Sequence, residues 1–374
     1  MRAYLLVALI SALVTFATTW ISVRVARKLK LHREPRERDV HESPTPRIGG
    51  IGMYLGLLAG IVAAALLGWF EGLFLNPAQP IAVLVAAAII VIVGLLDDLI
   101  DLDWTAKLAG QIFAAGVLVF QGIQILSLPI GGVTVGSYAV SVAISMFAVV
   151  VVMNAVNFID GLDGLAAGVV GIATAAFFAY SYLLAQQTTP SNYFSLAGLL
   201  SAIVLGITVG FIPLNWRPAK IFMGDSGAML LGLLMATSAI TVTGSIDPAT
   251  VTRSDLLPAL LPLLLPIAIL ILPLLDLALA VLRRIRKGKS PFQADRSHLH
   301  HQLQDLGHGH RGTVLVFYHW TLLISVSLLL FFFLPAPVVV SIALAWTVLA
   351  LCHTLWPILA RRLKRFDANS RKVS

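Results

Sequence analysis

Long apolar runs broken by short polar segments recur along nearly the whole chain. Many of them reach the roughly 20 residues that an α-helix needs to cross a hydrocarbon core about 30 Å thick. Backbone groups in lipid are satisfied only within helices or closed barrels, and continuous rather than alternating apolar runs favour helices. The chain is therefore expected to contain eleven spans: residues 4–23, 48–69, 79–96, 106–122, 138–158, 164–185, 193–213, 226–243, 254–282, 313–334 and 338–359.

One of the connections between these spans has a pattern of its own. Residues 128–135 alternate around the pair Gly131-Gly132, which is typical of a small β-hairpin. The predicted fold class is an all-α polytopic membrane protein with about eleven transmembrane helices and this small external hairpin. It forms a single integral membrane domain over residues 1–374.

The composition supports a membrane protein, because 58% of the residues are hydrophobic and only 12% are charged. A soluble domain is about one quarter charged. The first run lacks a small-residue cleavage site before the basic segment that follows, so we expect a helix and not a signal peptide. The single cysteine, Cys352, excludes an internal disulfide and a cysteine-based metal site.

The basic residues predict the orientation, because cytoplasmic loops retain lysine and arginine. With the N-terminus outside and the C-terminus in the cytoplasm, only Arg2 and Arg253 of the 26 basic residues fall outside. The others gather in basic loops at 24–47 and 283–312, in the tail 360–374 and at three isolated positions. The net charge of +8 needs no nucleic acid, since anionic lipid and phosphorylated substrates suit such a face.

An acidic motif closes the third predicted span. Helical spacing places Asp97 and Asp101 on one face, with Asp98 beside it. Carboxylates this close repel one another unless a divalent cation or a shared proton intervenes, and Mg²⁺ prefers carboxylate and phosphate oxygens. A water-facing acidic helix end is the alternative. Lys107, at the start of the next span, either meets a phosphate or anchors the inner membrane face.

A polar stripe ends the fifth predicted span, where Asn154, Asn157, Asp160 and Asp163 recur every three residues. On a helix this spacing forms one row of amides and carboxylates. The row can read a nucleotide or complete a metal shell. A glycine-rich turn that caps the helix is the alternative, and it explains the asparagines less well.

Two further motifs lie near predicted inner helix ends. Asp225 starts the eighth span, either as a helix cap or as a metal ligand beside phosphate-binding amides. Phe222 either stacks on a base or packs in the interior. The ninth span precedes a cluster that suggests a zinc site, a proton relay or, best, a diphosphate clamp: Arg296, His298, His300 and His301. His308 and His310 read as ordinary loop residues.

Taken in this order, the motifs make the chain resemble the polyprenyl-phosphate N-acetylhexosamine-1-phosphate transferases. The resemblance runs from the loop at Arg38 to His301 and is strongest for the bacterial branch that uses UDP-N-acetylglucosamine. Leu299 interrupts the histidine cluster, which is a run of consecutive histidines in the muramoyl-pentapeptide transferases. The resemblance implies a helical bundle with a cytoplasmic active-site cleft and a lateral groove for the prenyl chain.

The same resemblance implies roles for the residues. Asp97 and Asp98 are expected to be catalytic, one of them as the base that deprotonates the lipid phosphate. Asp225 and Asn157 are expected to hold Mg²⁺, with Mn²⁺ as a substitute. A larger set is expected to bind the substrates: Lys107, Asn154, Asn157, Asp160, Asp163, Phe222, Arg296, His298, His300 and His301.

The implied enzyme is a phosphoglycosyltransferase in the plasma membrane. It moves N-acetylglucosamine 1-phosphate from UDP-N-acetylglucosamine to undecaprenyl or decaprenyl phosphate, giving a sugar-diphospho-polyprenol and UMP. This is the first membrane step of cell-envelope glycopolymer synthesis. A single displacement and a route through a phosphorylated aspartate both stay open, as does a homodimer.

Three alternatives to this function remain at this stage. A phospho-N-acetylmuramoyl-pentapeptide transferase would share most of the motifs. An intramembrane prenyltransferase also uses aspartate-rich helix ends with Mg²⁺, but it pairs two similar motifs. An anion transporter would place its site near the bilayer midplane between repeated halves, whereas here the polar motifs stay at one face.

Overall fold

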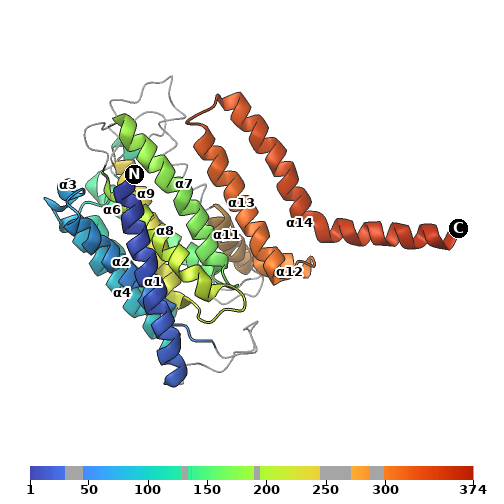
Figure 1. Ribbon diagram of the computed structural model, residues 1–374, viewed down its shortest axis with the longest axis horizontal. Coiled ribbons are helices and arrows are strands. Elements are labelled where there is room, and N and C mark those ends of the chain that lie inside the picture. Colours follow the sequence, from blue (N-terminus) through green and yellow to red (C-terminus); the bar gives the residue numbers. More distant parts are fainter. Residues whose placement is uncertain are drawn as a thin grey trace.

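The computed structural model describes residues 1–29, 45–125, 127–128, 134–135, 137–188, 194–244, 271–286, 288 and 299–373. Its elements follow in chain order (Figure 1): α1 (Arg2–Lys28), α2 (Gly49–Leu66), α3 (Glu71–Phe74), α4 (Ala78–Ile100), α5 (Trp104–Phe120), β1 (Ser127–Leu128), β2 (Thr134–Val135), α6 (Tyr138–Ile159), α7 (Leu165–Thr188), α8 (Leu196–Asn215), α9 (Gly224–Gly244), α11 (Ile271–Arg286), α12 (Leu299–Asp305), α13 (His310–Leu330) and α14 (Ala336–Val373).

Nine helices in the described part of the chain are long and apolar enough to cross a membrane. This confirms a polytopic helical membrane protein. The predicted count of eleven is not confirmed. Helix α5 has 17 residues, about 26 Å of helix and shorter than a typical hydrocarbon core. The predicted span 254–282 lies largely outside the described residues, and the helix at its end, α11, has 16.

Small residues allow α1 to pack closely against α2 and α8. Gly52, Gly56 and Gly60 recur every fourth residue along α2, and a side chain at any of them would collide with α1. These glycines face three small hydroxyl residues of α1: Ser11, Thr15 and Thr19. Gly206 and Gly210 of α8 approach backbone carbonyls of α1 in the same way. Close backbone approach drives helix association in lipid, where apolar side chains gain little by leaving the solvent.

Helix α9 lies at the centre of the bundle. Of its apolar stretch, 89% is buried, against 11% for α14. Helix α9 packs against α2, α4, α6 and α8, whereas α13 and α14 lie at one edge of the molecule (Figure 1). The last part of α14 turns away from the bundle (Figure 1). Four helices therefore fix the position of the polar residues at the start of α9.

The two short strands pair in the segment for which the sequence predicts a hairpin. Ser127 lies opposite Val135 and Leu128 opposite Thr134, in antiparallel register. The residues that connect the strands, 129–133, are outside the described part of the chain. That this element is on the external side of the membrane stays a prediction.

Candidate active site

Three charged side chains from three different helices meet at one point. Lys107, in the first turn of α5, places its Nζ atom 3.2 Å from Asp97 Oδ2 at the end of α4. The same ammonium group forms a second ion pair with Asp225 at the start of α9. The side chains of Lys107, Asp97 and Asp225 are 21%, 19% and 28% exposed, so solvent reaches the cluster. The structure thus brings together Asp97 and Lys107, predicted with the first acidic motif, and Asp225, predicted from a separate motif.

A tight connection between α4 and α5 sets this geometry. Asp101 adopts a left-handed conformation with φ of 53° and ends α4, so it leaves the helical face that the sequence predicts it to share with Asp97. Asp103 then caps α5 by accepting a hydrogen bond from Thr105 N at 3.2 Å. Hydrogen bonds from the Thr105 hydroxyl and backbone keep the pKa of Asp103 below its ordinary value. The chain reverses within three residues and brings Lys107 back to Asp97.

Asp98 points in a different direction, toward the first turn of α9. Its carboxyl group accepts a hydrogen bond from the backbone of Ser226, and its Oδ2 atom lies where a side chain at Gly224 would have to go. Gly224 also has a φ of +68°, which a residue with a Cβ adopts only at a cost. Gly94, one turn before Asp98, lies directly against the Ser226 backbone. These two glycines let α4 and α9 approach closely enough for Asp98 to cap α9.

The oxygen atoms of this cluster suit a metal ion that is shared with a substrate. Asp225 interacts with Asp97, Lys107 and the Asn157 side chain. Asp98 Oδ2 is buried and has no hydrogen-bond partner among the described residues. In that part of the chain, no group of three or more His, Cys, Asp or Glu side chains forms a metal site by itself. The residues therefore fit Mg²⁺, which uses one or two carboxylates plus substrate phosphates, and do not form a closed cage.

Asn154 and Asn157 have different surroundings although they share one helical face. Asn154 Nδ2 donates to Gln111 Oε1 at 2.7 Å and to Val150 O at 2.8 Å. The Asn154 amide is thus used in hydrogen bonds between α5 and α6, one helical turn before Asn157 in the chain. Gln111, which the sequence does not single out, is buried and joins the helices that carry Lys107 and Asn157.

Asp160 follows α6 and lies near the other carboxylates. Burial raises the pKa of Asp160 to about 7, and the negative charges of Asp225 and Asp163 act in the same direction. Arg47 opposes this increase and also acts electrostatically on Asp98. The charge of Asp160 is therefore coupled to the charges of the cluster at the end of α4 and the start of α9.

Asp163 is a structural link. It is 4% exposed, and its Oδ2 atom accepts a hydrogen bond from Ala219 N at 3.2 Å. The neighbouring Asn215 accepts from Gly164 N and donates to Ile221 O, both at 3.0 Å. These bonds hold the α6–α7 loop against the α8–α9 loop, which fixes the segment that leads into Asp225.

Arg47 belongs to a basic loop for which the sequence leaves a functional role and a rigid turn both open. The motif consists of Arg38, His41, Pro44, Pro46, Arg47, Gly49 and Gly50. The segment around Arg47 pairs with the α8–α9 loop: Phe222 N donates to Pro46 O at 2.9 Å, and Gly49 N donates to Phe222 O at 3.1 Å. The Phe222 backbone thus holds Arg47 beside the acidic cluster. Arg38 and His41, in the same basic loop, are outside the described residues. The prolines and glycines around Arg47 were the available signal.

Only part of the predicted histidine cluster can be placed. His301 is on α12, which starts where Asp276 Oδ1 accepts a hydrogen bond from Leu299 N at 2.9 Å. Asp276, fully buried on α11, therefore ties α12 to α11. Outside the described part of the chain are Arg296, His298 and the side chain of His300.

Comparison with known proteins identifies the family of this chain. Residues 80–243 match the family described as glycosyl transferase family 4. The decaprenyl-phosphate N-acetylglucosaminephosphotransferase of Mycobacterium leprae (strain TN) is 40% identical over 366 residues, covering 97% of this chain and 92% of the relative. The probable undecaprenyl-phosphate N-acetylglucosaminyl 1-phosphate transferase of Bacillus subtilis (strain 168) is 33% identical over 324 residues, covering 85% and 82%.

A more distant relative comes from the alternative named above. The phospho-N-acetylmuramoyl-pentapeptide-transferase of Mycolicibacterium smegmatis (strain ATCC 700084 / mc(2)155) is 34% identical over 270 residues, covering 62% of this chain and 74% of the relative. The matched family segment, 80–243, contains Asp97, Lys107, Asn157 and Asp225. Because a relative 40% identical is matched over nearly its whole length, the chain belongs to glycosyl transferase family 4.

Proposed function

We propose that this protein is a Mg²⁺-dependent enzyme that transfers N-acetylglucosamine 1-phosphate from UDP-N-acetylglucosamine to a polyprenyl phosphate. The ion-paired cluster of Lys107, Asp97 and Asp225 carries the proposal, because it combines a phosphate-binding cation with metal-binding oxygens. The names of the M. leprae and B. subtilis relatives support the sugar and the lipid acceptor. The distribution of basic residues supports a cytoplasmic position for the cluster.

In the proposed reaction, the β-phosphate of the donor exchanges its phosphoanhydride bond to UMP for one to the lipid phosphate. An oxygen of the lipid phosphate attacks the β-phosphorus of the donor, the bond to the bridging oxygen breaks, and UMP leaves with the electron pair. Mg²⁺, when bound, supplies charge neutralisation on the diphosphate. Lys107 contributes a donor to the same phosphates, and its contacts with Asp97 and Asp225 hold its ammonium group in place.

Asp97 and Asp98 have separate roles in this proposal. Asp97 is in contact with Lys107 and partly exposed, so we assign it as the base that takes the proton of the lipid phosphate on its carboxylate. Asp98 hydrogen-bonds the Ser226 backbone and lies against Gly224. It therefore acts as a positioning residue that fixes the start of α9, and with it Asp225.

The remaining residues surround the nucleotide in this proposal. Asp160 and Phe222 lie on the two loops that Asp163 joins, and these loops form the uridine side of the site. Asn154 is hydrogen-bonded to Gln111 and so ties α6, which carries Asn157, to α5, which carries Lys107. Arg296 and the histidine cluster provide the diphosphate clamp at the outer edge.

Purified protein with a choice of donors tests this function. In detergent with Mg²⁺ and decaprenyl phosphate, we expect UDP-N-acetylglucosamine to release UMP and to form a sugar-diphospholipid detectable by mass spectrometry. UDP-N-acetylmuramoyl-pentapeptide, the donor of the second candidate function, is the matched comparison. Turnover of that donor alone would contradict the proposed substrate, and turnover of neither would contradict the proposed enzyme class.

A further inference from the structure

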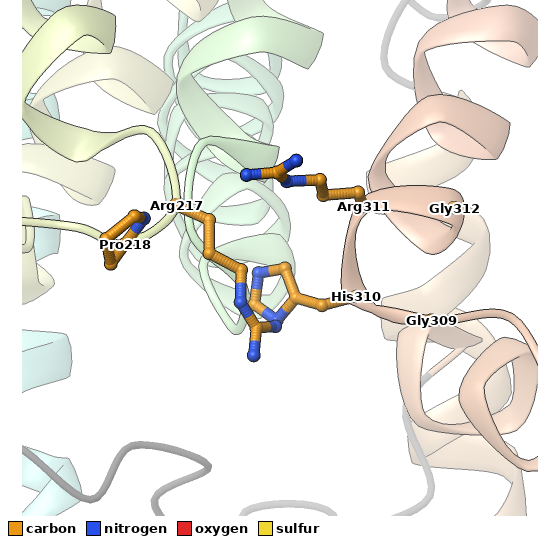
Figure 2. A pocket seen from close by; sticks show the side chains of 6 residues that line it. All are labelled: Arg217, Pro218, Gly309, His310, Arg311 and Gly312. Carbon is orange, nitrogen blue, oxygen red and sulfur yellow. The ribbon is translucent and has the colours of Figure 1, made fainter.

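A basic pocket is lined by residues that do not belong to the carboxylate cluster. It has a volume of about 450 Å³ and is formed between the α8–α9 loop and the start of α13. Six residues line it (Figure 2): Arg217, Pro218, Gly309, His310, Arg311 and Gly312. None of them is acidic, and none is among the residues assigned above to the transfer reaction. The sequence alone predicts His310 as an ordinary loop residue.

Two guanidinium groups give the pocket its charge. Arg217 extends from the α8–α9 loop toward the His310 ring, while Arg311 points from α13 back across the same opening (Figure 2). Within the described part of the chain, neither Arg217 nor Arg311 forms an ion pair or a hydrogen bond. Two neighbouring cations without a counter-ion repel each other, and an anion bound between them removes this repulsion.

The start of α13 adds neutral donors to the same pocket. Its N-cap residue is Gly309, which has no side chain to accept from the first N–H groups. The first backward hydrogen bond of the helix runs from Thr313 N to Gly309 O at 2.9 Å, so the preceding N–H groups have no intrahelical partner. Such a helix start favours anions. A Cβ at Gly309 would meet nothing within 4 Å, which shows that this side of the pocket has room for a ligand.

The position of the pocket indicates the chemistry of its ligand. It lies where two candidate spans, α8 and α13, end on one side of the bundle, the depth at which lipid headgroups are found. Planar guanidinium groups bind phosphate oxygens in pairs. We propose that Arg217, Arg311 and the start of α13 form a second phosphate-binding site, which takes the phosphate of an anionic phospholipid or a soluble phosphate.

This site shares a loop with the catalytic region. Arg217 is two residues from Ala219, whose N–H donates to Asp163 at 3.2 Å. Tyr318, on α13, donates its hydroxyl to Gly164 O at 2.5 Å. A phosphate that joins Arg217 to Arg311 therefore connects the two elements that already hold the α6–α7 loop.

Native mass spectrometry of the purified full-length protein tests the proposal by binding, independently of catalysis. Phosphatidylglycerol and phosphatidylcholine are titrated separately, and inorganic phosphate is added as a competitor. If the ligand is a lipid, we expect phosphatidylglycerol to bind more tightly than phosphatidylcholine. If the ligand is a soluble phosphate, we expect inorganic phosphate to bind in the place of phosphatidylglycerol. Arg217→Gln/Arg311→Gln is expected to weaken the preferred ligand by about tenfold or more, since charge-assisted hydrogen bonds are lost.

Lys220→Gln is the matched control, because Lys220 is an exposed cation of the same loop that does not line the pocket. It is expected to keep wild-type binding. The unfolding midpoint of each variant in phosphatidylcholine alone checks that the variant is folded. If the double variant is not folded, the single variant Arg311→Gln replaces it in the binding measurement. Binding of neither ligand, or an equal loss in Lys220→Gln, would overturn the proposal. If inorganic phosphate displaces phosphatidylglycerol, the site takes a soluble phosphate. If it does not, the site takes the phosphate of the lipid. Either result supports the site.

Discussion

Gly94→Ala tests whether the contact between α4 and α9 sets the catalytic geometry. The new Cβ would lie against backbone atoms of Ser226 and 2.8 Å from the carbonyl carbon of Asp225. Carbon atoms pack at about 3.5–4.0 Å. Backbone atoms cannot rotate away as a flexible side chain can, so the two helices must separate by about 1 Å.

This separation affects activity more than folding. Overpacking a membrane or soluble core costs about 1–3 kcal/mol, which a bundle of this size tolerates. A displacement of about 1 Å at reacting groups can cost roughly 100-fold in rate. We therefore expect a modest decrease in the unfolding midpoint and a decrease in kcat of about 100-fold, measured as UMP release under saturating substrates.

Gly116→Ala is the matched control, because it makes the same change in a neighbouring helix. A Cβ at Gly116 would meet Met146 at 3.7 Å and Phe120 at 3.8 Å, which are ordinary contacts. Alanine also favours a helix by about 1 kcal/mol over glycine, so stability and activity should be maintained. Wild-type kcat in Gly94→Ala, or an equal loss in both variants, would refute the reasoning.

Three further changes test other parts of the structure. Asp97→Asn should lower kcat by about 100-fold or more, as expected for loss of a general base. Asp98→Asn keeps an acceptor for Ser226 N–H and should lower kcat less. Equal decreases in kcat would contradict the separate roles. Because the pKa of Asp160 is raised from 3.8 to about 7, the folded protein holds this proton more tightly than the unfolded chain, so the contribution of Asp160 to stability falls as the pH rises through this interval. Asp160→Asn should therefore raise the unfolding midpoint more at about pH 8 than at about pH 5, and an equal change at both values would contradict the raised pKa. Gly56→Ala places a Cβ 3.0 Å from Ser11 O and against Thr15, so it should destabilise the protein by about 1–3 kcal/mol; an unfolding midpoint as high as that of Gly116→Ala would show that α1 and α2 do not pack as described.

The helices were predictable from the sequence because the lipid requires long apolar runs. Predicted span 138–158 corresponds to α6 at Tyr138–Ile159, and 226–243 corresponds to α9 at Gly224–Gly244. The count was less predictable, since α5 is both apolar and short. Nothing in the hydropathy of a helix says which neighbour it packs against. The central place of α9 depends on glycines such as Gly94, whose importance is visible only once Ser226 lies against it.

The candidate site was predictable as a set of residues but not as an arrangement. Carboxylates at the ends of apolar helices are costly, so Asp97 and Asp225 stand out by their position alone. Their joint ion pair with Lys107 requires the reversal at Asp101, which helical spacing does not predict. For the loop of Arg47 the sequence could not decide between a functional role and a rigid turn, because the place of Arg47 depends on backbone hydrogen bonds to a loop more than 170 residues away.

The most direct test of the central claim is Mg²⁺-dependent UMP release by the wild-type protein and by Asp225→Ala. Both are assayed with UDP-N-acetylglucosamine and decaprenyl phosphate over a range of Mg²⁺ concentrations. We expect release that depends on Mg²⁺ in the wild type, and a loss of about 100-fold or more in Asp225→Ala that added Mg²⁺ does not restore, since both the oxygen ligand and the partner of Lys107 are removed. Full Mg²⁺-dependent release by Asp225→Ala would contradict the assignment of the cluster at the ends of α4, α5 and α9 as the active site.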